Sequence, residues 1–150
     1  ILIPGNQVTY READKDFNRL NHFKVEEAGE KVAILALGDF YQRGEQLSAK
    51  IKAELGFTPT LINPRFASGI DKELLESLSE RHQMVITMED GILSGGFGEK
   101  IASFYGSSDM KVKNYGLDKK FYDRYDPNEL LKEVGMTPVQ IIADICNQIK

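Results

Sequence analysis

The feature that most constrains the fold is an unbroken apolar run at residues 32–37, which ends at Gly38. β-branched residues near its start favour a strand, and the lack of alternation with polar residues predicts that both faces of that strand are buried. Strands of this kind belong to parallel sheets that helices cover on both sides. The run is also too short to span a membrane as a helix, which needs about 20 apolar residues.

Helical and strand patterns alternate after this run. Leu47, Ile51 and Leu55 recur at a helical spacing and Gly56 closes the helix, while further strands are predicted at residues 60–63, 84–88 and 110–115. Asp71 is placed to cap a second helix, and a third covers residues 97–105. A short edge strand at residues 24–26, followed by a turn at Gly29, is expected to fold back on the 32–37 strand. This order predicts an α/β three-layer sandwich with a mostly parallel sheet of about five strands.

Two helices with clear start signals end the chain. Asp126 precedes Pro127 and Thr137 precedes Pro138, and each pair is followed by Glu or Gln at the third helical position, which is the capping-box arrangement. The last helix is expected to bury an apolar stripe made of Val139, Ile142, Ala143, Cys146 and Ile149. Cys146 is accordingly interpreted as a core thiol.

Composition narrows the functional classes. The 150 residues are 41% apolar and 28% charged, a mixture typical of a globular domain and not of a disordered chain. A formal net charge of −4 argues against a general nucleic-acid role, which usually shows as a basic face. One cysteine permits no internal disulfide and fits a reducing compartment. Because the chain starts on Ile1 in strand-like sequence, we expect residues 1–23 to be a linker from an upstream domain and residues 24–150 to form one domain.

A glycine-rich helix start is the richest candidate for chemistry. Gly95, Gly96 and Gly98 follow a predicted buried strand, where ligands gather in open α/β sheets and where free helix amides favour an anion. The alternative is that these glycines only allow a tight turn and close packing. The spacing matches neither the dinucleotide-binding nor the P-loop pattern, and Glu89 and Glu99 would repel a phosphate, so packing is favoured.

Charged residues at the strand ends are the other candidates. Glu89 and Asp90 are adjacent in a predicted strand, so their side chains point to opposite faces and are not expected to share a proton. We expect instead that a carboxylate here caps a nearby helix or forms a pair across a domain interface. Arg65 has two interpretations, binding of a phosphate or carboxylate and an ion pair with Glu89 or Asp90, of which the ion pair is favoured. Asp39 is interpreted as a helix N-cap.

No self-contained active site is predicted. His22 and His82 have no second ligand at metal-binding spacing, and no nucleophile elbow is present. We therefore assign no catalytic, cofactor-binding or metal residue. The candidate residues for anion binding or an interface are Arg65, Glu89, Asp90, Gly95, Gly96 and Gly98.

A set of short motifs resembles a known family. These are residues 60–66 (TLINPRF), 70–74 (IDKEL), the strand end at 85–90 (VITMED), 95–98 (GGFG), 114–117 (NYGL) and 126–131 (DPNELL). In order and spacing, from about Lys24 to the end, they are similar to the C-terminal domain of 1-deoxy-D-xylulose 5-phosphate synthase, within the transketolase superfamily.

The resemblance implies a role as part of a larger enzyme. That family is a cytoplasmic, three-domain homodimer that condenses pyruvate with glyceraldehyde 3-phosphate, releases carbon dioxide and supplies isoprenoid and thiamine precursors. Its thiamine diphosphate and Mg²⁺ lie between the first two domains. This chain would be the third domain, with no cofactor of its own, inactive alone, and partnered by the upstream thiamine diphosphate-binding domains and not by nucleic acid or membrane.

One departure and two alternatives stay open. The family usually has Arg-Tyr-Pro-Arg-Gly-Asn before this domain, with an arginine that helps to hold the sugar phosphate, whereas residues 1–6 here are Ile-Leu-Ile-Pro-Gly-Asn. Either the phosphate has a different ligand or the substrate differs. The alternatives are the matching domain of a 2-oxo acid dehydrogenase beta subunit, or another transketolase, and a stand-alone anion-binding module that uses residues 95–98.

Overall fold

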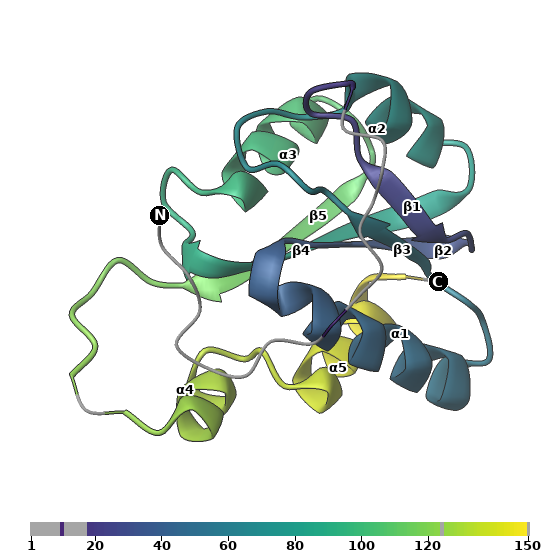
Figure 1. Ribbon diagram of the computed structural model, residues 1–150. Coiled ribbons are helices and arrows are strands. Elements are labelled where there is room, and N and C mark those ends of the chain that lie inside the picture. Colours follow the sequence, from purple (N-terminus) through teal and green to yellow (C-terminus); the bar gives the residue numbers. More distant parts are fainter. Residues whose placement is uncertain (1–9, 11–17, 124, 150) are drawn as a thin grey trace.

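A five-stranded sheet forms the centre of the protein. The structure, a computed structural model, describes Tyr10 and residues 18–123 and 125–149. The strands lie in the order β1-β3-β2-β4-β5, with β1 antiparallel to β3 and all other neighbours parallel (Figure 1). Their bounds are β1 Lys24–Glu27, β2 Lys31–Ala36, β3 Thr60–Asn63, β4 His82–Ile92 and β5 Lys111–Leu117. The α/β class and the mostly parallel sheet are confirmed.

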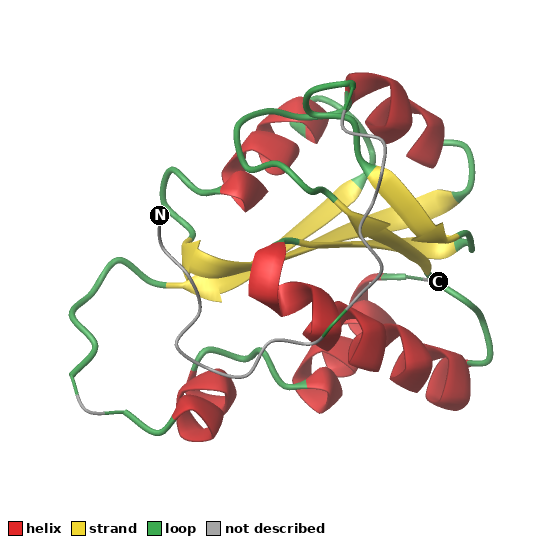
Figure 2. Ribbon diagram, in the orientation of Figure 1, coloured by secondary structure: helices red, strands yellow, loops and turns green. Residues whose placement is uncertain are grey.

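Helices cover both faces of this sheet, so the domain has three layers (Figure 2). α2 (Lys72–Leu78) and α3 (Phe97–Tyr105) lie on one face. On the other face lie α1 (Tyr41–Leu55), which a short 3₁₀ turn η1 (Gly38–Phe40) precedes, and α4 (Pro127–Glu133) and α5 (Pro138–Gln148). In the described residues, no helix is both long enough and apolar enough to cross a membrane.

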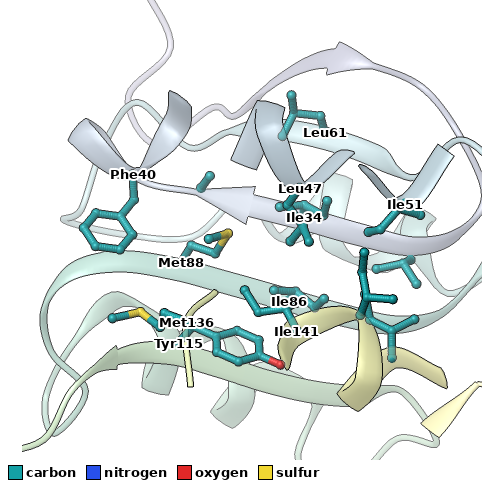
Figure 3. Packing of buried hydrophobic residues seen from close by; sticks show 14 of the residues in the cluster. Ile34, Phe40, Leu47, Ile51, Leu61, Ile86, Met88, Tyr115, Met136 and Ile141 are labelled. Carbon is teal, nitrogen blue, oxygen red and sulfur yellow. The ribbon is translucent and has the colours of Figure 1, made fainter. Parts of the chain in front are cut away.

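Burial of β2 explains the apolar run. Val32, Ile34 and Ala36 belong to the core beneath α1 and α5, where Figure 3 shows Ile34 close to Leu47 of α1. Ala33 and Leu35 point into the opposite core beneath α2 and α3. All five side chains are fully buried, because the sheet lies between two helical layers and neither face of its central strand meets water.

The predicted partner of β1 is wrong. β1 pairs with β3 and not with β2, because the two edges of β2 are already occupied by parallel β3 and β4. The turn after β1 rests against the start of β3 instead, where Glu30 N–H donates to Thr58 O at 2.9 Å. The short, charged β1 thereby becomes an edge strand.

The helix-end predictions are confirmed in most cases. Gly56 has φ of 75° at the end of α1, and the Asp71 side chain accepts the Leu74 amide at the start of α2. Asp126 caps α4, and Thr137 with Gln140 forms a complete capping box on α5. Strand β4 extends beyond the predicted 84–88 at both ends, whereas β5 begins one residue later than the predicted 110–115 and ends two residues later.

The N-cap prediction for Asp39 is wrong. Asp39 is exposed inside η1, and Phe40 occupies the N-cap position of α1 without a side-chain cap bond. The 3₁₀ turn continues directly into α1, and the amide of Tyr41 donates to Gly38 O. Backbone hydrogen bonding thus replaces the expected carboxylate.

The buried face of α5 differs in part from prediction: the predicted Ile142 is buried and Ile149 packs against the core, but other members of the stripe are exposed. Ile141, Ile142 and Ile145 are buried, whereas Val139 is 65% exposed and Cys146 is exposed. Apolar residues occur on most sides of this helix, so several helical phases were compatible with its sequence. The interpretation of Cys146 as a core thiol is therefore wrong.

Part of the predicted linker contacts the domain. Residues 1–9 and 11–17 lie outside the described residues. Phe23 is buried, and its ring centroid lies 5.9 Å from that of Phe97 at the start of α3. The chain is thus already packed against the α2–α3 side before β1 begins.

Adjacent substitutions on α5 test the assignment of its buried face. Ile145→Ala should lower the free energy of unfolding by about 2–5 kcal/mol, because it removes a fully buried side chain. Cys146→Ala, the matched control one residue away on the exposed side, should change it by less than about 0.5 kcal/mol. Urea denaturation measures both values, and an equal loss in the two variants would contradict the assigned face.

Candidate functional site

The candidate residues lie around the carboxyl edge of the sheet, which we define as the ends of β3 and β4 together with the start of α3. Arg65 follows β3, Glu89 and Asp90 lie near the end of β4, and Gly95–Gly98 lead into α3. Parallel strands end at the same edge, which is why the segments that follow β3 and β4 both lie there. In the structure Glu89 contacts the glycine turn, whereas the Arg65 side chain binds the carbonyl oxygen of His22.

Glu89 is a buried carboxylate that caps α3. Its side chain is only 6% exposed in relative terms, and its two oxygens accept the amides of Phe97 at 2.9 Å and Gly98 at 2.8 Å. These amides are among the first of α3, where unsatisfied N–H groups and the helix dipole favour a negative charge. The expectation that a carboxylate here caps a nearby helix is confirmed, and the chain itself supplies the anion.

The glycines of this turn allow close contact with that carboxylate and with the sheet. A Cβ atom on Gly96 would lie 2.7 Å from Glu89 Oε2 and 2.7 Å from Ile92 O. A Cβ atom on Gly98 would lie 2.6 Å from Thr87 Oγ1, whose hydroxyl donates to Asn114 at 2.8 Å. Any larger residue would push α3 away from β4 and β5, so the packing explanation of the glycine pattern agrees with the geometry.

A second carboxylate holds the outer part of the turn. Gly95 has φ of 78°, and its amide donates to Glu99 Oε2 at 2.7 Å. One turn into α3, the Lys100 ammonium donates to Ala67 O at 2.7 Å and ties the helix to the segment after β3. Gly69, Ile70, Gly95, Gly96, Glu99, Lys100 and Ser103 line an open depression of about 540 Å³ between these two segments.

Arg65 does not make the predicted ion pair with Glu89 or Asp90. Its Nε and Nη2 donate to the carbonyl oxygen of His22 at 3.1 and 2.6 Å, while Glu89 accepts backbone amides and Asp90 is exposed on the opposite face. Arg65 has φ of 62°, a left-handed backbone conformation that is uncommon for a residue other than glycine. Its backbone N–H donates to Asn63 Oδ1 at 3.0 Å, which supports that conformation.

Asp71 has a second role that sequence reasoning missed. Besides capping α2, the buried carboxylate accepts the amide of Phe23 at 2.9 Å and lies 2.8 Å from His22 Nδ1. The carbonyl of His22 is the group that Arg65 holds. Since 48 residues separate Phe23 from Asp71, no local pattern indicates this contact.

Other titratable groups have structural roles. Burial raises the pKa of the Tyr105 hydroxyl, which donates to Leu75 O at 2.6 Å. Burial, together with the Asp144 carboxylate that it contacts at 2.8 Å, raises the pKa of Tyr115. Across Tyr10, 18–123 and 125–149, no three His, Cys, Asp or Glu side chains gather as metal ligands.

Comparison with known proteins identifies the family. Residues 21–141 match the family described as "Transketolase, C-terminal domain". The chain belongs to this family. A solved structure, "Split gene transketolase, inactive beta4 tetramer", has the same fold with a TM-score of 0.74 at 23% identity, over 85% of this chain and 42% of that one.

Two bacterial relatives of this transketolase C-terminal domain have the same description. The 1-deoxy-D-xylulose-5-phosphate synthase of Prochlorococcus marinus is 31% identical over 95% of the chain, and that of Shouchella clausii is 32% identical over 99%. The chain spans 22% and 24% of the length of these two relatives. It therefore corresponds to a part of such proteins, as the sequence motifs predict.

Neighbouring carboxylates allow a test of the cap on α3. Glu89→Gln should lower the free energy of unfolding by about 1–3 kcal/mol, because an amide group replaces one acceptor oxygen beside two buried backbone donors. Asp90→Asn, on the exposed side of the same strand, should change it by less than about 0.5 kcal/mol. Chemical denaturation at neutral pH compares the two, and an unaffected Glu89→Gln variant would contradict the capping role.

Proposed function

We propose that this chain acts as the C-terminal domain of a 1-deoxy-D-xylulose 5-phosphate synthase-like enzyme of the transketolase type. The parent would join pyruvate to glyceraldehyde 3-phosphate with thiamine diphosphate and Mg²⁺, for isoprenoid and thiamine precursor synthesis. The observation that carries the proposal is the similarity to two synthases over 95% and 99% of this chain. The same matches cover only 22% and 24% of those synthases, which supports a role as one domain of a longer enzyme.

Within that parent, the domain would have an architectural and non-catalytic role. At its carboxyl edge, the amides of Gly95, Phe97 and Gly98 already donate to the chain's own carboxylates, and the guanidinium of Arg65 holds a backbone carbonyl. The polar groups that a ligand would need are therefore engaged inside the domain. This arrangement favours an edge that packs against another domain over one that binds an anion.

The proposed domain comprises residues 24–150, and the preceding residues 1–23 connect it to the thiamine diphosphate-binding domains. Contacts of His22 and Phe23 with Asp71 and Arg65 would fix the direction in which the connection reaches the domain. We further propose that the parent is a cytoplasmic homodimer and that this domain adds to the dimer interface. The single cysteine agrees with a reducing compartment.

An isolated architectural domain should not bind the cofactor. Calorimetric titration of the 150-residue chain with thiamine diphosphate and Mg²⁺ should give no binding heat, because no described residue cluster offers metal ligands and the helix amides are occupied. Micromolar binding would contradict the architectural role. A full synthase such as that of Shouchella clausii, titrated in parallel, is the positive control.

Domain replacement tests the role in the parent. In the Shouchella clausii synthase, residues 24–150 of this chain should replace the corresponding segment with retention of the dimer and of product formation from pyruvate and glyceraldehyde 3-phosphate. A second chimaera that also carries residues 1–23 tests the Ile1–Asn6 departure. We expect its apparent KM for glyceraldehyde 3-phosphate to rise, because the arginine typical of the family is missing.

The outcomes separate the parts of the proposal. A folded dimer without activity for the 24–150 chimaera would contradict a purely architectural role. A folded monomer would contradict dimer support. Equal KM values for the two chimaeras would show that residues 1–23 do not influence phosphate binding.

A further inference from the structure

A hydrogen-bonded cluster lies at the opposite edge of the sheet, where β2, β3 and β4 begin. We call Gly29, Thr60 and His82 the amino-edge cluster. Thr60 is the first residue of β3 and His82 the first of β4, and β2 lies between these two strands. The side chain of His82 therefore reaches across the start of β2, and its contact with Thr60 joins β4 to β3.

Each polar group of this cluster has a partner. His82 Nε2 lies 2.8 Å from Thr60 Oγ1, and His82 Nδ1 lies 2.9 Å from Leu78 O. The Thr60 hydroxyl oxygen also accepts the amide of Gly29 at 2.9 Å. A carbonyl oxygen only accepts, so Nδ1 carries a proton and donates to Leu78. In the neutral ring, Nε2 is then an acceptor and receives the Thr60 hydroxyl proton.

The turn that this cluster holds is tightly packed. A Cβ atom on Gly29 would lie 2.0 Å from Thr58 O and 2.6 Å from the carbonyl carbon of Pro59. Lys31, the next residue but one, donates its amide to Arg81 O at 2.9 Å. Movement of Thr60 or His82 is therefore transmitted directly to the backbone between β1 and β2.

Protonation of His82 would remove the acceptor of the Thr60 hydroxyl proton. A cationic ring donates from both nitrogens, so Thr60 Oγ1 would use its two lone pairs to accept from His82 and Gly29, and its own proton, on a side chain that is buried, would have no acceptor in the cluster. The charge would also sit in a partly buried position near the Arg81 charge, with Glu30 as the nearby acid; Lys31 is the register partner of His82 on β2, and its ammonium lies over the Phe57 ring.

The surroundings of the ring agree with a neutral state in the folded protein. Burial lowers the pKa of His82 below its usual 6.5, the Leu78 carbonyl raises it in part, the Arg81 charge lowers it further, and Glu30 acts in the opposite direction. As the pH falls below 6.5, the unfolded chain takes up a proton here that the folded chain does not. Stability therefore decreases with falling pH until the folded-state pKa is reached.

We propose that the amino-edge cluster is a pH-dependent conformational switch: neutral His82 holds the turn between β1 and β2 against the start of β3, and protonation of His82 releases that turn. The released segment includes Gly29 and Glu30, whose amides bond to Thr60 and Thr58. The carboxyl edge, with Glu89 and α3, is not part of the switch. The proposal does not depend on the function proposed above.

Amide hydrogen exchange, followed by NMR in the 150-residue chain, tests this switch. As the pH falls from about 7.5 through the midpoint of His82, the protection factor of the Gly29 amide should fall about tenfold, since a hydrogen bond is lost, while that of Gly98 should stay constant. The imidazole resonances of His82 should titrate below pH 6.5 with the same midpoint as the change at Gly29.

Matched histidine variants give the control. His82→Gln, which has no proton to gain in this range, should abolish the pH dependence of Gly29 protection. His22→Gln, at the other histidine of the chain, should leave it intact. If His82→Gln does not fold, the test rests on two other measurements. In the unmodified chain, the His82 titration should share its midpoint with the change in Gly29 protection. In Thr60→Ser, which keeps the hydroxyl, the pH dependence of Gly29 protection should persist. Constant Gly29 protection, a His82 midpoint at or above 6.5, or loss of pH dependence in His22→Gln alone would overturn the proposal.

Discussion

Complete burial of β2 is the constraint on which the rest of the structure depends. Its side chains fill both cores, and its two edges are hydrogen-bonded to β3 and β4. With both edges occupied, β1 has no position beside β2 and pairs with the outer edge of β3. With both faces occupied, helices must lie above and below the sheet. The three-layer architecture and the peripheral β1 therefore share one cause.

Because the centre of the sheet is buried, the polar groups at its two ends need hydrogen-bond partners within the protein. Backbone and side-chain polar atoms there have little water, so each needs an internal partner. At the carboxyl edge, Glu89 satisfies the first amides of α3, and Thr87 donates to Asn114. At the amino edge, Thr60 satisfies both Gly29 and His82. In the described part of the chain, every buried side-chain nitrogen and oxygen has a hydrogen-bond partner.

Local patterns in the sequence were sufficient for the elements and most of their ends. The apolar run of β2 and the capping signals at Asp71, Asp126 and Thr137 depend on neighbouring residues, so sequence alone predicts them. The buried face of α5 was predicted only in part: Ile142 is buried as expected, but apolar residues cover a wide arc of this helix, and contact with the sheet selects Ile141 and Ile145 in place of Val139 and Cys146. The partners of β1 and Arg65 were missed because they lie far along the chain.

The two edges of the sheet differ in how their polar groups respond to solution conditions, and that difference follows from the residue types. At the carboxyl edge, the Glu89 carboxylate meets the backbone amides of Phe97 and Gly98, which donate at any pH. At the amino edge, the central group is an imidazole, whose Nε2 accepts in the neutral ring and donates in the cationic ring, and burial lowers the pKa of His82 below 6.5. The strands of the sheet therefore separate a helix cap made by a carboxylate at one edge from the proposed proton-sensitive contact at the other.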